Sequence, residues 1–249
     1  MRDVPDSFDK IGAQQYDHPG NPLHPCQTHT ISIADQNTLE PAVHQNSGYN
    51  AKCNENGCDS NVLPAKLRMI GRFSDGIEIP LKHFFGSLSV APPEISGRIR
   101  SAPPWIHAGN LDNKELVAGT TLFIPVHTRG ALFLAGDGHA GQGNGEVDIT
   151  ALETSLIGTF QLIVRKDMHL KWPRAETPSH YITMGIHEDL TEATKGALRE
   201  MIDFLVTEKH LTRDEAYMLS SVAADLEITQ LVDGNKGVHA MIPKAIFKK

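Results

Sequence analysis

The chain has 249 residues, of which 40 % are hydrophobic, and this is enough to bury the core of one large domain or of two small ones. Its 21 glycines, 15 prolines and low aromatic content of 6 % favour a strand-and-loop protein over a helical bundle. The net charge is −7 and no basic patch stands out, which argues against nucleic acid as a partner. The chain shows neither an apolar signal core nor a run of about 18 apolar residues, which argues against a membrane. We therefore expect a soluble, cytoplasmic protein.

The first quarter of the chain is polar and keeps no helical or alternating apolar period, apart from a short strand expected at Thr28–Ile33. It also holds all three cysteines, and an odd number argues against a disulfide framework. Incidental thiols are our interpretation, and the alternative is a zinc site made from Cys53, Cys58, His44 and Asp59. We therefore expect an irregular N-terminal region at 1–64 and a folded domain at 65–249.

Strand patterns begin where the folded domain begins. Apolar or alternating runs predict strands at Leu67–Phe73, Ile77–Leu81 and Phe84–Val90, before a loop region rich in proline. The run Thr121–Val126 is β-branched or apolar at nearly every position, which indicates a strand buried on both faces. We expect it to pair near Gly130–Ala135.

The second half adds two helices between further strands. Strands are predicted at Gly158–Val164 and Tyr181–Ile186, with Trp172–Pro178 as a connection interrupted by prolines. Apolar residues at three- and four-residue steps predict a helix over 191–208.

A capping box at Thr212–Glu215 begins a second helix over 213–224, which should turn Tyr217, Met218 and Val222 inward. The last expected pair of strands is Leu226–Val232 and Val238–Ile242, joined by the turn Asp233–Gly237. The order of these elements predicts a β-rich α+β fold with mixed or antiparallel, sandwich-like sheets and two consecutive helices near 191–224.

One stretch, Leu132–Asp148, combines an apolar strand with a loop that holds five glycines between Gly136 and Gly145. Glycine lets a backbone approach a ligand closely, and the loop carries side chains of the types that bind zinc and similar divalent ions. Asp137 and His139 are two residues apart, so an extended segment would place both on one face. We predict that Asp137, His139 and Glu146 converge as three metal ligands with one open position, the arrangement of a catalytic zinc.

Such a metal acidifies a bound water and polarises a carbonyl oxygen, as hydrolysis of an amide requires. We predict Glu146, Gln142 and Glu153 as catalytic residues, with Glu153 as general base and then acid. Asn110, Gln142 and His107 are the predicted substrate-binding residues. Turn chemistry is an equal alternative for the segment around Asn110 and Asp112, and a solvated strand carboxylate is the alternative for Glu153. The chain has no Gly-x-Ser-x-Gly elbow, which favours a metal-activated water over a serine nucleophile.

Several motifs, in order, resemble the acetamidase/formamidase family. They are Ile79–Lys82 with Phe85-Gly86, Pro103-Pro104 to Asp112, Gly136–Val147, Trp172–Pro178 and Leu231–His239, and the resemblance runs from about Phe73 to Phe247. It implies hydrolysis of short aliphatic amides such as formamide or acetamide to a carboxylate and ammonia. It also implies a catalytic domain at 65–249, a β-rich fold, a bound divalent metal (zinc, with calcium as a further option) and homo-oligomers.

Two other functions stay open. Trp105 stands where a glycine is expected, and the family's usual N-terminal β-region is not recognisable in 1–64, so a truncated or diverged relative that binds a ligand or partner without turnover is the first alternative. A metal hydrolase acting on an ester or another carbonyl substrate is the second. His180, His187 and His239 are interpreted as surface or packing histidines.

Overall fold

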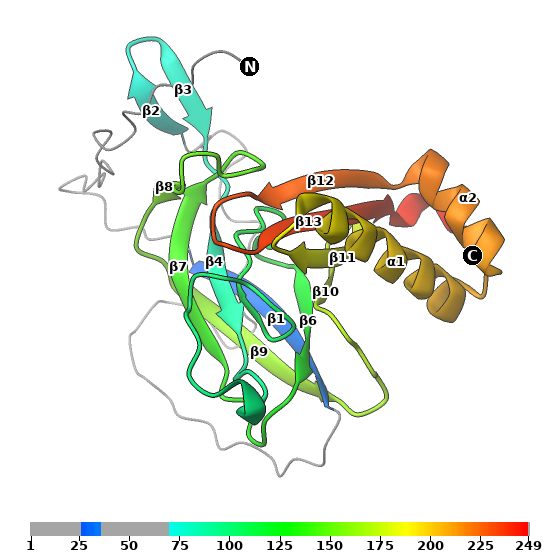
Figure 1. Cartoon of the computed structure of the whole chain (residues 1–249). Coiled ribbons are helices and arrows are strands. Elements are labelled where there is room, and N and C mark those ends of the chain that lie inside the picture. Colours follow the sequence, from blue (N-terminus) through cyan, green and yellow to red (C-terminus); the bar gives the residue numbers. More distant parts are fainter. Residues whose placement is uncertain (1–25, 36–69, 249) are drawn as a thin grey trace, which may run out of the picture.

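The computed structural model describes residues 26–35 and 70–248 (Figure 1). Within them the strands form a seven-stranded sheet in the order β12-β13-β11-β10-β6-β1-β9, a four-stranded sheet in the order β5-β4-β7-β8, and the hairpin β2-β3. The strands of the large sheet are β1 (Cys26–Asp35), β6 (Thr121–Val126), β9 (Ile157–Arg165), β10 (Arg174–Glu176), β11 (His180–His187), β12 (Asp225–Gln230) and β13 (Lys236–Pro243). Those of the small sheet are β4 (Phe84–Ser89), β5 (Ala108–Asn110), β7 (Leu134–Gly141) and β8 (Leu152–Glu153), and the hairpin consists of β2 (Ile70–Ser74) and β3 (Ile77–Pro80).

The large sheet is mixed. β1 pairs in parallel with β6 and β9, whereas β10, β11, β12 and β13 pair antiparallel with their neighbours. The strand expected at Thr28–Ile33 lies inside β1, and the strand expected at Thr121–Val126 is β6, which is buried at five of its six residues. The large and small sheets share one apolar core, in which Phe85 and Leu88 of β4 lie in one cluster with Leu122, Ile124 and Ile182. This confirms the predicted β-rich, sandwich-like α+β fold.

Two expectations about pairing and connections are wrong. β6 pairs with β1 and β10 rather than with residues near Gly130–Ala135. Ala131 and Leu132 adopt left-handed backbone conformations, with φ of 57° and 53°, and this turn carries the chain into the small sheet. The stretch Trp172–Pro178 was expected to be a connection, but its middle residues form β10, a strand too short to show a periodic pattern between its flanking prolines.

The stretch expected to be a glycine loop is largely a strand. β7 extends through Gly141 and pairs with β4 and β8, so that Asp137 and His139 stand on a sheet. A Cβ atom on Gly138 would lie 2.4 Å from the carbonyl oxygen of Thr154. Glycine is therefore needed at this position because the segment around Thr154 packs closely against it, and not because the backbone is a flexible loop.

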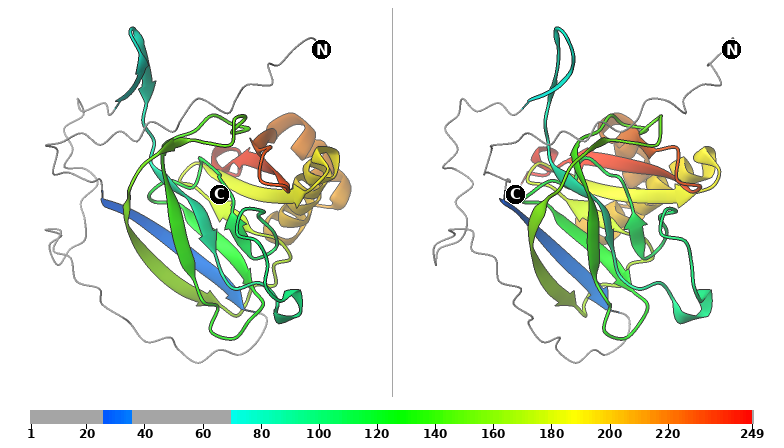
Figure 2. Two further views of the ribbon diagram at one scale, coloured as in Figure 1. Left: turned by 60° about the vertical axis from the view of Figure 1, so that its left-hand side comes forward. Right: turned by 90° about the vertical axis from the view of Figure 1, so that its left-hand side faces the viewer.

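Both helices lie on one side of the molecule, next to β11, β12 and β13 (Figures 1 and 2). α1 (Leu190–Lys209) confirms the predicted helix, and its buried residues pack with Val238, Ala240 and Ile242 of β13. α2 (Arg213–Ala223) begins with the predicted capping box, in which the side chains of Thr212 and Glu215 accept each other's backbone N–H.

The prediction of which residues of α2 point inward is wrong. Tyr217, Met218 and Val222 are 60, 60 and 82 % exposed, whereas Ala216 and Ser220 are buried. Ala216 and Ser220 are also four residues apart, and their small side chains permit a closer helix contact than an aromatic ring would. Among the described residues, no helix has an apolar stretch long enough to cross a membrane.

Candidate metal centre

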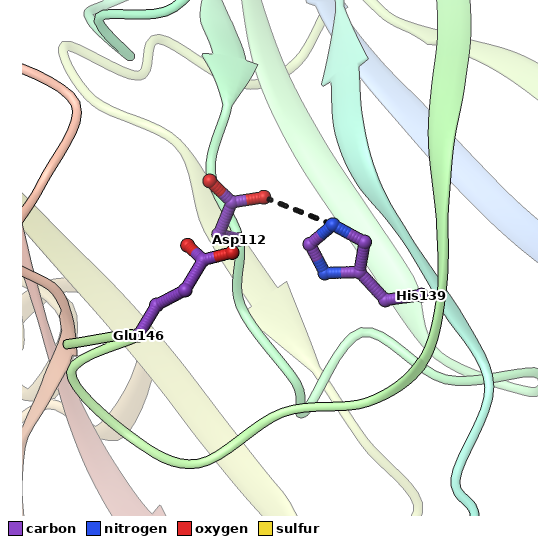
Figure 3. Close-up of side chains that lie close together, drawn as sticks. All are labelled: Asp112, His139 and Glu146. Atoms are coloured by element: carbon purple, nitrogen blue, oxygen red, sulfur yellow. Dashed lines mark ion pairs between the residues drawn. The ribbon is translucent and has the colours of Figure 1, made fainter. Parts of the chain in front are cut away.

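His139 on β7 is the centre of a cluster of carboxylates. Its Nε2 atom lies 3.3 Å from Oδ1 of Asp137, 3.5 Å from Oε2 of Glu153 and 3.9 Å from Oδ1 of Asp112. In the described part of the chain, two groups of three residues each bring one ligand atom per residue within 4.8 Å of one another. Asp112 and Glu146 form one group with His139 (Figure 3), and Asp137 and Glu153 form the other with the same histidine.

The small sheet positions these side chains. Asp137 and His139 alternate with Gly138 on β7 and therefore share a face, and Glu153 of β8 is directly paired with His139. Asp112 follows β5, where its backbone N–H donates to the carbonyl oxygen of Gly86 at 3.1 Å. Glu146 comes from the loop after β7, at a turn in which its N–H donates to the carbonyl oxygen of Gly143 at 3.2 Å.

Gly86 on β4 lies against three of these side chains. A Cβ atom built on Gly86 would lie 2.4 Å from Oδ1 of Asp112 and 2.7 Å from Oδ2 of Asp137, and 3.0 Å from the ring of His139. Only glycine fits between them without displacing one. The cluster is therefore built around a position that requires the smallest residue.

A glutamine orients the central imidazole. Nδ1 of His139 lies 2.9 Å from Oε1 of Gln142, and Nε2 of Gln142 donates to the carbonyl oxygens of Asp112 at 2.6 Å and Thr229 at 3.5 Å. Because the amide nitrogen faces these carbonyl groups, the amide oxygen faces the ring and accepts from Nδ1–H. The neutral ring then presents the lone pair of Nε2 to the carboxylates, as a metal-ligating histidine does.

Burial makes the carboxylates costly without a cation. Burial is the main cause that raises the pKa of Asp112 to about 10, and a hydrogen bond with Asp233 and the charges of Glu146, Asp233 and Asp137 add to it. Burial likewise raises the pKa of Glu146 to about 7. Oδ1 of Asp112 and Oε2 of Glu146 are buried without a hydrogen-bond partner in the described structure. Buried carboxylate oxygens that accept no hydrogen bond, next to an imidazole nitrogen that faces several carboxylates, suit a divalent cation, so the donor set fits a metal.

A proton competes with a metal for the same groups. Burial lowers the pKa of His139, but the hydrogen bond and charge of Asp137, with the charge of Glu153 and the hydrogen bond to Gln142, together outweigh it, so the pKa of His139 is raised. The pKa of Asp137 is lowered, first by its hydrogen bond with His139. A positive charge at this position, carried by a proton or by a metal ion, is therefore what the carboxylates favour.

The predicted ligands all lie in this cluster, though in different groups. Asp137 groups with Glu153, and Glu146 groups with Asp112, and each group includes His139. Asp112 was not among the predicted ligands, because an aspartate in a segment rich in glycine and proline fits a turn equally well. Glu153, the predicted general base, accepts hydrogen bonds through Oε1 from the hydroxyl of Thr150 at 3.2 Å and the N–H of Ala151 at 3.0 Å.

Two of the three predicted substrate-binding residues use their amide groups within the protein. Gln142 holds His139, and Asn110 donates from Nδ2 to Asp112 at 2.6 Å and to Asp233 at 3.2 Å while its Oδ1 accepts from the hydroxyl of Ser87. Asp233 is a member of the site that the sequence pattern did not reveal, because its turn signal gives no hint of a partner 123 residues away.

The third predicted substrate-binding residue, His107, has other surroundings. Its ring is buried with Nδ1 unpartnered, and its pKa is lowered by burial and then by the charge of His127. None of the contacts described for His107 joins it to His139 or to the carboxylates. The alternative zinc residues Cys53, Cys58, His44 and Asp59 lie outside the described residues.

Comparison with known proteins gives a consistent family. Residues 95–249 match the model of the acetamidase/formamidase family. The structure is similar to an acetamidase from Bacillus halodurans, with 32 % identity and a TM-score of 0.63 over 70 % of this chain and 59 % of that one. It is also similar to an acetamidase from Yersinia enterocolitica, with 31 % identity and a TM-score of 0.65 over 73 % of this chain and 56 % of that one.

A curated acetamidase of Mycolicibacterium smegmatis is 41 % identical over 49 residues, which are 20 % of this chain and 12 % of that protein. The chain thus spans less than two thirds of the length of each of these relatives. Asp112, Asp137, His139, Glu146 and Glu153 all fall within the matched residues 95–249.

Proposed function

Because the chain belongs to the acetamidase/formamidase family, we propose that it hydrolyses short aliphatic amides, such as formamide or acetamide, to the carboxylate and ammonia. One observation carries this proposal. The Nε2 atom of a buried histidine faces carboxylates from three separate segments, and two of the buried carboxylate oxygens have no hydrogen-bond partner in the described structure. This arrangement is suited to a divalent metal and to the activation of water beside it.

His139, Asp112 and Glu146 would hold the ion, and Asp137 offers a further oxygen beside the same imidazole nitrogen. One nitrogen and several oxygen donors suit zinc, and calcium is the alternative for a site so rich in carboxylates. Such an ion supplies Lewis acidity, which acidifies water and polarises an amide carbonyl group. Gln142 and Asn110 are positioning residues here, since one fixes the tautomer of His139 and the other holds Asp112.

In this proposal Glu153 is the residue that moves protons. Its side chain is 36 % exposed, and its Oε1 is held by Thr150 and Ala151 while Oε2 faces Nε2 of His139. In the proposed reaction Oε2 takes a proton from the attacking water and then delivers it to the departing ammonia. A carboxylate that keeps one oxygen fixed and the other toward solvent and the site is suited to both steps.

Ammonia release from formamide, acetamide and propionamide tests the proposal, with and without a chelator and after zinc is restored. We expect Glu153→Gln to lower kcat by about 100-fold or more, since general acid–base catalysis contributes about 10²–10⁴-fold. Its KM and metal content should stay near those of the wild type. The control is Glu78→Gln, which changes an exposed carboxylate on β3. Activity that survives both chelation and Glu153→Gln contradicts this mechanism.

Other results of the same assay point to the alternatives. A folded protein that binds zinc and releases no ammonia fits a diverged relative that binds a ligand or partner without turnover. Hydrolysis of esters but not of amides fits another metal hydrolase at the same site. The family resemblance also leads us to propose a homo-oligomer in the cytoplasm, and size-exclusion chromatography with light scattering checks its subunit number.

A further inference from the structure

The loop that carries Glu146 is fastened to the edge of the large sheet. The N–H of Gly145 donates to the carbonyl oxygen of Thr229 at 3.1 Å, and the N–H of Leu231 donates back to Gly145 at 3.0 Å. The amide of Asn144 donates to the carboxylate of Glu227. Asn144 and Gly145, the two residues before Glu146, are thus hydrogen-bonded to β12. This strand belongs to the large sheet, whereas His139 lies on the small one.

An irregularity in β12 creates this attachment. The pairing of β12 with β13 shifts register between Ile228 and Gln230, which is the position of Thr229. A residue at such a bulge is released from the regular ladder. The carbonyl oxygen of Thr229 accepts from the loop, including from Nε2 of Gln142 at 3.5 Å, and the Thr229 hydroxyl lies 2.7 Å from Nδ1 of His239.

His239 on β13 contacts both residues of β12 that hold the loop. Its ring is fully buried, with Nδ1 at the hydroxyl of Thr229 and Nε2 3.7 Å from Oε2 of Glu227. Nε2 is buried without a hydrogen-bond partner in the described structure. A leucine or methionine would fill similar space without burying polar atoms, so the imidazole requires a reason beyond packing.

We infer that His239 is a positioning residue: through Thr229 and Glu227 it fixes the loop 142–146, and with it the carboxylate of Glu146 and the amide of Gln142. The sequence pattern indicated only a packing or surface histidine. The inference rests on the proposed function in one respect, namely that the loop contributes Glu146 to the metal-binding cluster around His139. The loop attachment itself is a property of the protein without any ion.

The experiment removes the hydroxyl group of Thr229 and keeps the shape of the side chain. Thr229→Val is the test, Thr229→Ser is the conservative rescue, and Thr183→Val is the matched control. Thr183 is as buried as Thr229, and its hydroxyl donates to the carbonyl oxygen of Ala197 at 2.9 Å, far along the chain from the loop. Each variant is measured for hydrogen exchange in 142–147 without metal, for zinc affinity by competition with a chromogenic chelator, and for Tm.

We expect Thr229→Val to speed exchange at the Gly145 amide by about tenfold or more and to weaken zinc binding about 10–100-fold, the effect typical of residues that support metal ligands. Thr229→Ser and Thr183→Val should leave both quantities within about twofold, even where Thr183→Val lowers Tm. His239→Leu should act like Thr229→Val, whereas His239→Asn, which can still bond the hydroxyl, should act like Thr229→Ser.

Unchanged exchange at Gly145 in Thr229→Val, or an equal change in Thr183→Val, overturns the inference. If Thr229→Val does not fold, the pair His239→Leu and His239→Asn decides by the same measurements. A wild-type protein that binds no zinc, cobalt, manganese or calcium contradicts the proposed function alone, because the exchange measurement needs no metal.

Discussion

At the scale of single residues, three carboxylates of the cluster stand in backbone conformations that most residues avoid. Asp112, Asp137 and Glu146 have φ of 47°, 60° and 41°. A left-handed conformation costs a residue other than glycine roughly 1 kcal/mol or more. Asp137 holds this conformation within a strand, so the surrounding sheet must enforce it. Backbone strain gathered at one cluster of buried acids is a further sign that the cluster serves a function rather than stability.

The space at Gly86 leads to the first prediction. Gly86→Ala should abolish zinc binding while the far-UV circular dichroism stays that of the wild type, because the new Cβ would displace Asp112 and Asp137. Gly136→Ala is the control, since a Cβ on this glycine of the neighbouring strand meets no atom within 4 Å. Isothermal titration with zinc measures the loss. Wild-type affinity in Gly86→Ala would show that the ion binds elsewhere.

The burial of His239 predicts a specific pH dependence. Burial lowers the pKa of His239 from 6.5 to about 4. Between these values the unfolded chain binds a proton that the folded protein refuses, so the free energy of unfolding is highest above pH 6.5 and falls as the pH drops toward 4. At about 1.4 kcal/mol per pKa unit, the full effect is roughly 3 kcal/mol.

Urea unfolding at pH 7 and pH 5 checks this value. The free energy of unfolding of the wild type should fall by about 2 kcal/mol more than that of His239→Asn over this interval. Comparing the two proteins removes the contributions of other titrating groups, such as Asp112 and Glu146, that both share. Equal losses in the two proteins would mean that His239 takes up its proton in the folded state.

At the scale of elements, helix α1 packs on the large sheet through glycine. A Cβ on Gly185 of β11 would lie 2.0 Å from the carbonyl oxygen of Ala193 and 2.3 Å from the backbone nitrogen of Ala197, and backbone atoms of a helix cannot move individually. Gly185→Ala should therefore push α1 off the sheet and cost about 3 kcal/mol of unfolding free energy. Thermal and urea unfolding measure the cost, with Gly136→Ala as the control. A change below about 0.5 kcal/mol would contradict this packing.

The elements that the sequence predicted well are those whose signal is local. The apolar stripe of α1, the capping box at Thr212 and the continuous apolar run of β6 each depend on neighbours in the chain, and all three are confirmed. The pairing of β6 and the orientation of α2 depend on distant segments, and these predictions were wrong. Gly138 illustrates the reason. Glycine occurs both in flexible loops and where two strands pack closely, and only the position of Thr154 shows that Gly138 belongs to the second kind.

The site was predictable to a similar degree. The spacing of Asp137 and His139 on an extended chain predicted their shared face, and the structure places their side chains 3.3 Å apart. Asp112, Asp233 and Thr229 join the site from segments far apart in the sequence, and their local patterns resemble ordinary turns and strands. Contacts between such distant segments cannot be predicted from the local sequence pattern around each residue.

At the scale of the whole molecule, the cluster joins two sheets. His139, Asp137 and Glu153 belong to the small sheet, whereas the loop of Glu146 is held by β12 of the large one. An ion bound by His139 and Glu146 would therefore link the two sheets and stabilise the folded protein as a whole. Repulsion among the buried acids would also end, which adds to the stabilisation.

This linkage makes the melting temperature a measure of occupancy. A ligand at 100 times its Kd stabilises the folded state by about 2.7 kcal/mol, and each kcal/mol moves Tm by roughly 2–4 °C in a protein of this size. Zinc restored to chelated protein should therefore raise Tm by roughly 5–10 °C. The shift should vanish in His139→Asn, and also in Glu146→Gln if the loop contributes a ligand. A full shift in Glu146→Gln together with none in His139→Asn would instead assign the ion to the group of Asp137, His139 and Glu153, on the small sheet alone.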